Sequence, residues 1–165
     1  MAATRPRGET GVRTTVSKAT GATYDAGLRG FFAYRDLGAR EATGGGHAAH
    51  IIRAVPGEGP KPAWHTHDLG FQLVLVLQGW VRFEYEDIGE VLLERGDSVI
   101  QPPGVRHREV AHSDDLEMLE VTSPAAFQTA EAEAPAGRAA RLDEAGSAVA
   151  SSALAEASPA GVAER

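Results

Sequence analysis

Apolar and polar residues alternate along the middle of the chain in the pattern of β-strands. In residues 80–86, Val81, Phe83 and Tyr85 alternate with charged residues, and this period of two gives one buried face and one exposed face. Residues 71–78 are almost continuously apolar, which indicates a strand buried on both faces. Turn residues recur about every eight to twelve positions, a spacing typical of an all-β sandwich or barrel.

The strands that this pattern predicts form a small antiparallel barrel, so the predicted fold class is all-β. Gly79 makes a tight connection between two of them, and Pro102, Pro103 and Gly104 form a cluster that interrupts the chain after another. There are about eight predicted strands, which span residues 31–36, 47–55, 71–78, 80–86, 90–94, 98–101, 106–111 and 116–121.

Composition divides the chain into three regions. Residues 1–20 are rich in Thr, Arg and Gly without a sustained period, which predicts a flexible arm or a loosely held first strand. Residues 21–123 contain the barrel. Residues 124–165 are mostly Ala, Glu, Ser, Gly and Pro, so we expect a low-complexity, Ala-rich tail that is a frayed helix or disordered. A segment that folds on contact with a partner is the functional alternative for this tail.

Length, charge and cysteine content exclude several classes of protein. The 165 residues suffice for one domain with tails. Cysteine is absent, which excludes disulfides, thiolate metal sites and a cysteine nucleophile. The formal net charge of −7 argues against a surface that binds nucleic acid. The chain has no apolar run long enough to span a bilayer and no apolar stretch of a secretory signal, so we expect a cytoplasmic protein that binds no membrane.

Two of the six histidines are spaced as metal ligands. His65 and His67 are separated by one residue, and alternate side chains of an extended chain point the same way, so both rings can face one point inside the barrel. A metal needs several donors that converge at about 2.0–2.2 Å, and this pair supplies two of them. The pair alone does not establish a metal site, because the same spacing also occurs incidentally in loops.

Two longer stretches of the chain extend this pattern. The first consists of Gly59, five residues, His65, Thr66, His67, four residues, Gln72, six residues and Gly79. The second consists of Gly96, five residues, Pro102, Pro103, Gly104, two residues and His107. Sixteen residues lie between Gly79 and Gly96. In order, spacing and gap, the two stretches resemble the two signature motifs of the cupin superfamily, and the resemblance covers about residues 45–123.

This resemblance implies a double-stranded β-helix, a jelly-roll-like antiparallel barrel, with one divalent transition metal ion at its centre. His65, His67, Gln72 and His107 occupy the ligand positions of the family. Iron, nickel, zinc, manganese and copper all suit a nitrogen-rich site. The alternative is a metal-free barrel in which the histidines only form hydrogen bonds. The resemblance also implies a homodimer, because cupins commonly pair through their sheets and N-terminal strands.

The fourth ligand of most metal-binding cupins is Glu, whereas this chain has Gln72. Three imidazoles and an amide leave the double charge of the ion uncompensated, which favours anionic or enolate-like substrates and Lewis-acid chemistry without excluding dioxygen chemistry. Glu109 lies two residues after His107 and is a candidate ligand or catalytic general base, or else a charge on the rim. His50 is a further candidate ligand, with a structural role as its alternative.

The function that these residues predict is metal-dependent catalysis on a small carbonyl or phenolic compound. The reaction would be an isomerisation, cyclisation or lyase reaction at a Lewis acid, or dioxygenase chemistry, with Glu109 transferring a proton. A non-catalytic module that binds or senses a small molecule or a metal is the alternative. A metal-free epimerase-like cupin with His107 as base is a third hypothesis, which leaves His65 and His67 unexplained.

Overall fold

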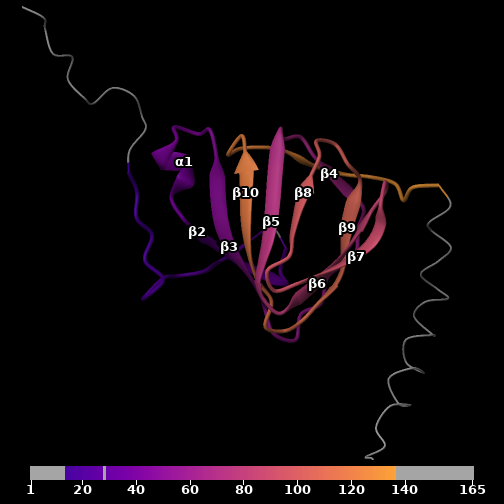
Figure 1. The fold of residues 1–165 in the computed structure, drawn as a ribbon, viewed down its shortest axis with the longest axis horizontal. Helices are drawn as coiled ribbons and strands as arrows, with labels where there is room; N and C mark the ends of the chain where they lie inside the picture. Colours follow the sequence, from indigo (N-terminus) through magenta and orange to yellow (C-terminus); the bar gives the residue numbers. More distant parts are fainter. Residues whose placement is uncertain (1–13, 28, 137–165) are drawn as a thin grey trace, which may run out of the picture. The chain divides into compact units, whose positions relative to one another are not determined.

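The computed structural model describes residues 14–27 and 29–136, which form two antiparallel β-sheets (Figure 1). The elements in chain order are β1 (Asp25–Ala26), β2 (Phe32–Asp36), α1 (Ala39–Ala42), β3 (Ala48–Ala54), β4 (His65–His67), β5 (Phe71–Gln78), β6 (Trp80–Tyr85), β7 (Gly89–Glu94), β8 (Ser98–Gln101), β9 (His107–His112), β10 (Glu117–Ser123) and β11 (Thr129–Glu131). One sheet has six strands in the order β1-β2-β3-β10-β5-β8, and the other has five in the order β11-β4-β9-β6-β7.

The all-β prediction is confirmed, and each of the eight predicted strands is present with bounds that differ by no more than two residues. The short strands β1 and β11 and the four-residue helix α1 were not predicted. Strand β5 differs from the prediction in one respect, because only one of its faces is fully buried and the residues between are partly exposed.

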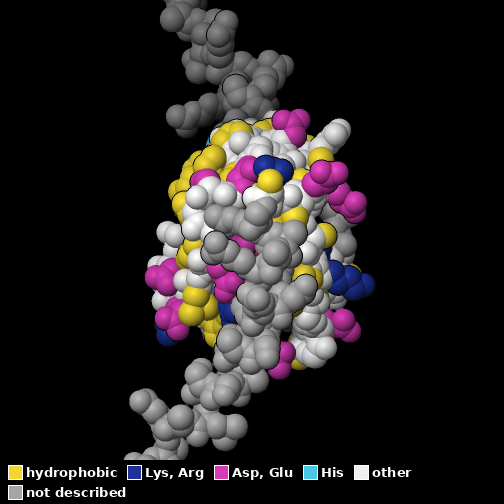
Figure 2. Space-filling model, turned by 90° about the vertical axis from the view of Figure 1, so that its right-hand side faces the viewer, with side chains coloured by type: hydrophobic (Ala, Val, Ile, Leu, Met, Phe, Trp, Pro, Cys, Tyr) yellow, Lys and Arg dark blue, Asp and Glu magenta, His cyan; other side chains and the backbone are white. Residues whose placement is uncertain are grey.

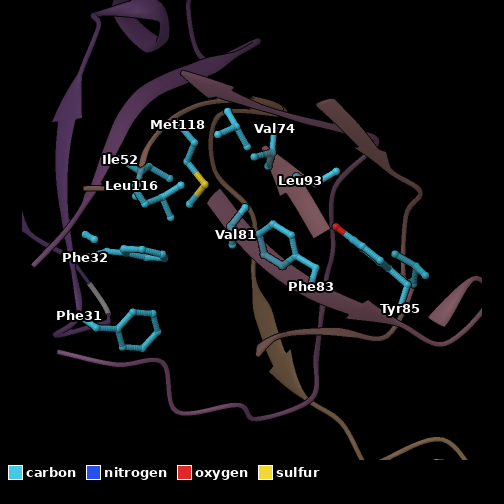
Figure 3. Close-up of a cluster of buried hydrophobic side chains, with 13 residues drawn as sticks. Phe31, Phe32, Ile52, Val74, Val81, Phe83, Tyr85, Leu93, Leu116 and Met118 are labelled. Atoms are coloured by element: carbon cyan, nitrogen blue, oxygen red, sulfur yellow. The ribbon is translucent and has the colours of Figure 1, made fainter. Parts of the chain in front are cut away.

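The hydrophobic core lies between the sheets, on the faces that the alternation predicts to be buried (Figure 3). On β6, Val81, Phe83 and Tyr85 are 0, 6 and 2% exposed. Burial of one such side chain stabilises the fold by about 1.5–3 kcal/mol, so this cluster fixes how the two sheets face each other. The cluster consists of Phe31, Phe32, Ile52, Ala54, Val74, Val76, Val81, Phe83, Tyr85, Leu93, Val105, Leu116 and Met118.

The tail predicted at residues 124–165 contains a strand. Strand β11 pairs with β4 in a register that places Thr129 opposite His67 and Glu131 opposite His65. The expectation of a frayed helix or disorder is therefore wrong for residues 129–131. Composition missed this strand because pairing with β4, rather than large apolar side chains of its own, holds it in place. The rest of the predicted tail, residues 137–165, lies outside the described residues.

Residues 14–20 of the predicted N-terminal arm contain no strand, and residues 1–13 lie outside the described residues. Among residues 14–27 and 29–136, no helix has the length and apolar character that a membrane crossing requires. Figure 2 shows Asp and Glu side chains spread over the described part of one face, in keeping with the formal net charge of −7.

Gly79 forms the turn between β5 and β6 with a φ of +69°, a conformation that disfavours residues with a Cβ. A Cβ at this position would clash with the Ser113 side chain and would lie 3.0 Å from Leu116 Cα. Ser113 cannot easily move away, because its Oγ accepts a hydrogen bond from the Trp80 N–H at 3.0 Å. Gly79 is thus required both for its backbone conformation and for its lack of a side chain.

We predict that Gly79→Ala destabilises the fold by about 3 kcal/mol or more, whereas Gly96→Ala costs about 1–2 kcal/mol. Gly96 is a matched control, because its φ is +96° and an added Cβ meets no atom within 4 Å. Chemical denaturation of both variants measures the difference. Equal losses of unfolding free energy would show that the contact with Ser113 has no energetic weight.

Candidate metal centre

Three histidines converge on one point of the five-stranded sheet. Strands β4 and β9 are neighbours, and His65 of β4 pairs directly with His107 of β9. His67 lies two residues after His65, on the same face of its strand. The nitrogen atoms that the three rings offer lie within 4.8 Å of one another, and no carboxylate belongs to this cluster among the described residues. The structure therefore brings together three of the four predicted metal ligands.

Hydrogen bonds at Nδ1 orient the three imidazoles. In His65 and His107 the Nδ1–H donates to the backbone carbonyl two residues earlier, at 2.9 and 3.0 Å. Nδ1 of His67 lies 2.9 Å from the hydroxyl oxygen Oγ1 of Thr129. In the tautomer that His65 and His107 have, the Nδ1–H of His67 donates a hydrogen bond to this oxygen. With the proton on Nδ1, each ring keeps the lone pair of Nε2. Imidazole nitrogens held in this way fit a transition metal ion.

Burial keeps these histidines neutral. Loss of solvation lowers the pKa of His65 to about 4 and, together with the neighbouring His107 and His65 rings, the pKa of His67 to about 3. The pKa of His107 is lowered by burial as well. Because a metal and a proton compete for the same lone pair, three rings that are unprotonated at neutral pH are ready to bind a cation.

Gln72 lies on β5 in the other sheet and is 3% exposed. Its Nε2–H donates a hydrogen bond to Glu120 Oε1 at 2.8 Å. This bond fixes the orientation of the amide, and Oε1 of Gln72 is buried without a hydrogen-bond partner among the described residues. A buried polar atom without a partner is costly in free energy, and an amide oxygen is also an atom that can coordinate a cation. Gln72 Oε1 therefore has the chemistry of a fourth ligand, and its coordination stays a prediction.

Sequence analysis missed Glu120, which supplies a carboxylate to this part of the interior. It lies on β10 between Met118 and Thr122, which are 3 and 1% exposed, so the alternation along β10 places all three on the inner face. That alternation was the available signal. Burial raises the pKa of Glu120, whereas the hydrogen bond from Gln72 and the charges of His50 and Arg29 oppose this effect.

Glu109 is 3% exposed, so it is not a charge on the rim. Burial raises the pKa of its carboxyl to about 8 against the opposing charge of Arg29, which makes the protonated form the main one at neutral pH. The register of β9 shifts opposite Phe83, and His112 therefore faces the interior together with Glu109. Glu109 Oε1 lies 3.7 Å from His112 Nε2, and neither atom has a hydrogen-bond partner among the described residues.

His50 lies outside the cluster of three histidines. It is partly buried on β3, where its Nδ1 is 4.0 Å from Glu120 Oε2 and its ring meets the edge of Tyr34 at a centroid distance of 6.3 Å. His50 thus contacts the carboxylate that orients Gln72. This contact favours its structural alternative over the ligand hypothesis.

Arg29 also reaches the site, although sequence analysis did not single it out. Its Nη2–H donates a hydrogen bond to His65 Nε2 at 2.7 Å. This bond requires a lone pair on Nε2, in agreement with the tautomer that the Ala63 carbonyl imposes on His65. Residue 29 precedes β2 in a segment without periodicity, so no sequence signal marked it.

The family model of the cupin domain matches residues 50–122, a range that runs from β3 to β10 and includes His65, His67 and His107. The chain therefore carries a cupin domain. Its two signature motifs supply the three converging imidazoles, and the turn at 102–104 lies against β4, where the Gly104 N–H donates to the His67 carbonyl at 3.3 Å.

Solved cupin structures share this fold, which confirms the predicted double-stranded β-helix. KdgF from Halomonas sp. is 19% identical with a TM-score of 0.56, over 68% of this chain and 96% of that one. The polyketide cyclase RemF from Streptomyces resistomycificus is 15% identical with a TM-score of 0.60, over 75% and 89% of the two chains. Fe(II) HppE is 15% identical with a TM-score of 0.52, over 66% and 60%. No curated protein matches the sequence significantly.

We predict that Thr129→Val lowers the affinity of the cupin domain for Zn²⁺ by about 10- to 100-fold, because His67 loses the acceptor that fixes its ring. Valine has the shape of threonine and a high β-propensity, so strand β11 should persist. Thr129→Ser keeps the hydroxyl and should stay within a few-fold of wild type. Competition with a chromophoric chelator measures all three affinities, and equal values would exclude a positioning role of Thr129.

The buried carboxyl of Glu109 leads to a second prediction, which concerns how the stability of the metal-free protein depends on pH. The folded state keeps the Glu109 proton up to a pKa of about 8, whereas the ordinary glutamate value of 4.5 applies when the chain unfolds. Between these values the folded state binds more protons, so stability falls as the pH rises. Relative to Glu109→Gln, wild type should therefore lose roughly 2–4 kcal/mol of unfolding free energy from pH 4.5 to pH 8. Denaturation curves across this range measure the loss, and parallel pH profiles would contradict it.

Proposed function

We propose that the cupin domain is a metal-dependent enzyme that acts on a small carbonyl or phenolic compound by Lewis-acid chemistry of the isomerase, cyclase or lyase type. One observation carries this proposal. Three neutral imidazoles, of which among the described residues only His65 has its Nε2 engaged, by Arg29, converge in the same interior that holds a buried, protonated carboxyl group, Glu109. A cation site and a proton donor on the same strand β9, which carries both His107 and Glu109, are the two components that such reactions need.

His65, His67, Gln72 and His107 would hold the ion, three through Nε2 and one through the amide oxygen. When bound, a divalent ion supplies a Lewis acid that polarises a carbonyl or phenolic oxygen. The hydrogen bonds at Nδ1 and the bond from Gln72 to Glu120 keep all four donors in place before the ion arrives. This preorganisation favours tight binding, since little side-chain entropy is left to lose.

Glu109 is the proposed catalytic acid–base residue. Its buried carboxyl holds a proton at neutral pH, and His112 Nε2 lies 3.7 Å from its Oε1, too far for a hydrogen bond. A substrate that brings a basic carbon or oxygen to Glu109 would receive the proton there, and the carboxylate that remains can take one back. Phe31 stacks on His112 with ring centroids 6.1 Å apart, which helps to exclude water from this pair.

The neighbours with this fold support the proposal at the level of reaction class. RemF is named a polyketide cyclase, and the HppE structure contains Fe(II). The Fe(II) neighbour keeps dioxygenase chemistry as the second candidate function for an iron-loaded form. Both functions use the same donor set, so the metal and the co-reactant distinguish them rather than the site residues.

We predict that protein purified without added metal contains up to one transition metal ion per chain, and that His107→Ala loses both the ion and turnover. Glu109→Gln should keep the ion but lower kcat by about 10²- to 10⁴-fold on a diketone, phenol or keto acid that wild type converts. Glu90→Gln, an exposed partner of Arg82, is the matched control and should behave as wild type. Metal analysis and turnover are measured on the same samples.

Two outcomes would change this assignment. Substoichiometric metal that survives His107→Ala unchanged would remove the metal-dependent enzyme from consideration. Full metal occupancy without turnover of any compound in the panel, with or without dioxygen, would favour the non-catalytic binding module. Oxygen uptake that requires iron would favour the dioxygenase over the Lewis-acid enzyme.

A further inference from the structure

The backbone of Arg29 is anchored at the start of β2. Its carbonyl accepts a hydrogen bond from the Phe32 N–H at 3.0 Å, and a nearby carbonyl of the same turn, that of Phe31, accepts one from the Val55 N–H at 2.9 Å. Phe31 and Phe32 are 6 and 3% exposed within the core. The segment that carries Arg29 is therefore fixed to the six-stranded sheet, so the position of the side chain is set by the fold.

From this anchor the guanidinium of Arg29 reaches the five-stranded sheet. Its Nη2 lies 2.7 Å from His65 Nε2, the atom proposed to bind the metal. A guanidinium offers donors only, so it stands at this lone pair as a cation. Burial, the largest effect, raises the pKa of Glu109, and the charge of Arg29 opposes it. In His67 the charge of Arg29 adds to the lowering of the pKa by burial and by the rings of His107 and His65. One fixed positive charge thus acts on both parts of the site.

Arg29 differs from other arginines of the domain in its partner. Among the described residues four arginines form an ion pair with a carboxylate, whereas Arg29 forms none and instead donates a hydrogen bond to the buried His65 ring. Those pairs are Arg53 with Glu117, Arg82 with Glu90, Arg106 with Glu86 and Arg108 with Glu84. A half-buried guanidinium that makes no ion-pair contact is suited to bind an anion from outside, because the fork of N–H groups matches a carboxylate in geometry and charge.

We propose that Arg29 binds the carboxylate of a small organic acid whose neighbouring carbonyl or hydroxyl oxygen is held at the metal centre. This inference rests on the proposed function and names its substrate class. His65 Nε2 has one lone pair, which cannot serve a metal ion and the Arg29 N–H together. A metal ion bound at His65 Nε2 would therefore break the hydrogen bond from Arg29. The N–H donors of the guanidinium would then be available to the carboxylate of the acid.

This arrangement has two consequences of opposite sign. Removing the guanidinium takes away a competing cation and a hydrogen bond that the metal must displace, so the affinity for the metal rises. The same change removes the partner of the carboxylate, so the affinity for an organic anion falls. A purely structural role of Arg29 would lower both affinities or leave both unchanged.

Isothermal titration calorimetry of Arg29→Gln tests both consequences on the full chain. Zn²⁺ is titrated first, and the zinc-loaded protein is then titrated with lactate and with lactamide, which has the same hydroxyl but no charge. Wild type should bind lactate at least about tenfold more tightly than lactamide, given the strength of charge-assisted pairs. Arg29→Gln should bind Zn²⁺ about 3- to 10-fold more tightly and lactate about tenfold more weakly.

Two further variants complete the design. Arg82→Gln removes the same charge from an arginine paired with Glu90 and should leave both affinities at wild-type values. Arg29→Lys keeps the charge without the fork and should recover part of the lactate affinity. If wild type takes up no zinc, the metal centre fails and the inference fails with it. If zinc binds but Arg29→Gln binds lactate as wild type does, only the role of Arg29 is overturned.

Discussion

The pairing of β4 with β9 is the constraint on which the site depends. It places His65 directly opposite His107, and the alternation within β4 adds His67 on the same face. Since both strands are held by backbone hydrogen bonds in a five-stranded sheet, the three imidazoles are set by the fold and not by a flexible loop. Their Nδ1 hydrogen bonds then leave only Nε2 for a ligand. Strand register thus assembles three imidazoles that could hold a metal ion.

The charges around this centre differ from those that the ligand residues alone suggest. Three imidazoles and the amide of Gln72 carry no charge, and on that basis a bound ion would be uncompensated. The structure adds the buried carboxyl of Glu109, the partly buried carboxyl of Glu120 and one guanidinium, Arg29. A cation held by the histidines would lower the pKa of both carboxyl groups from the values that burial sets, because an opposite charge nearby favours the ionised form.

Sequence reasoning was most successful where one local rule decides the structure. Alternation located the eight main strands, and the His-x-His spacing with the following motif located the three histidines. It failed where a residue is placed by a partner far away in sequence. Strand β11 exists through its pairing with β4, and Arg29 reaches His65 only because its turn is anchored to the core. Glu120 alternates with Met118 along β10, but a charged residue is ordinarily expected on the exposed face of a strand, so alternation alone did not mark it as a site residue.

Strand β11 has a practical consequence for work with this protein. It lies beside β4 and contributes Thr129 to His67, and the Ala132 N–H donates to the Trp64 carbonyl at 2.9 Å just after it. The family match ends at residue 122, before this strand begins. Expression boundaries taken from that match would thus remove the outer support of the histidine cluster. Fusion partners, affinity tags and protease sites belong beyond Ala132, where they leave this support intact.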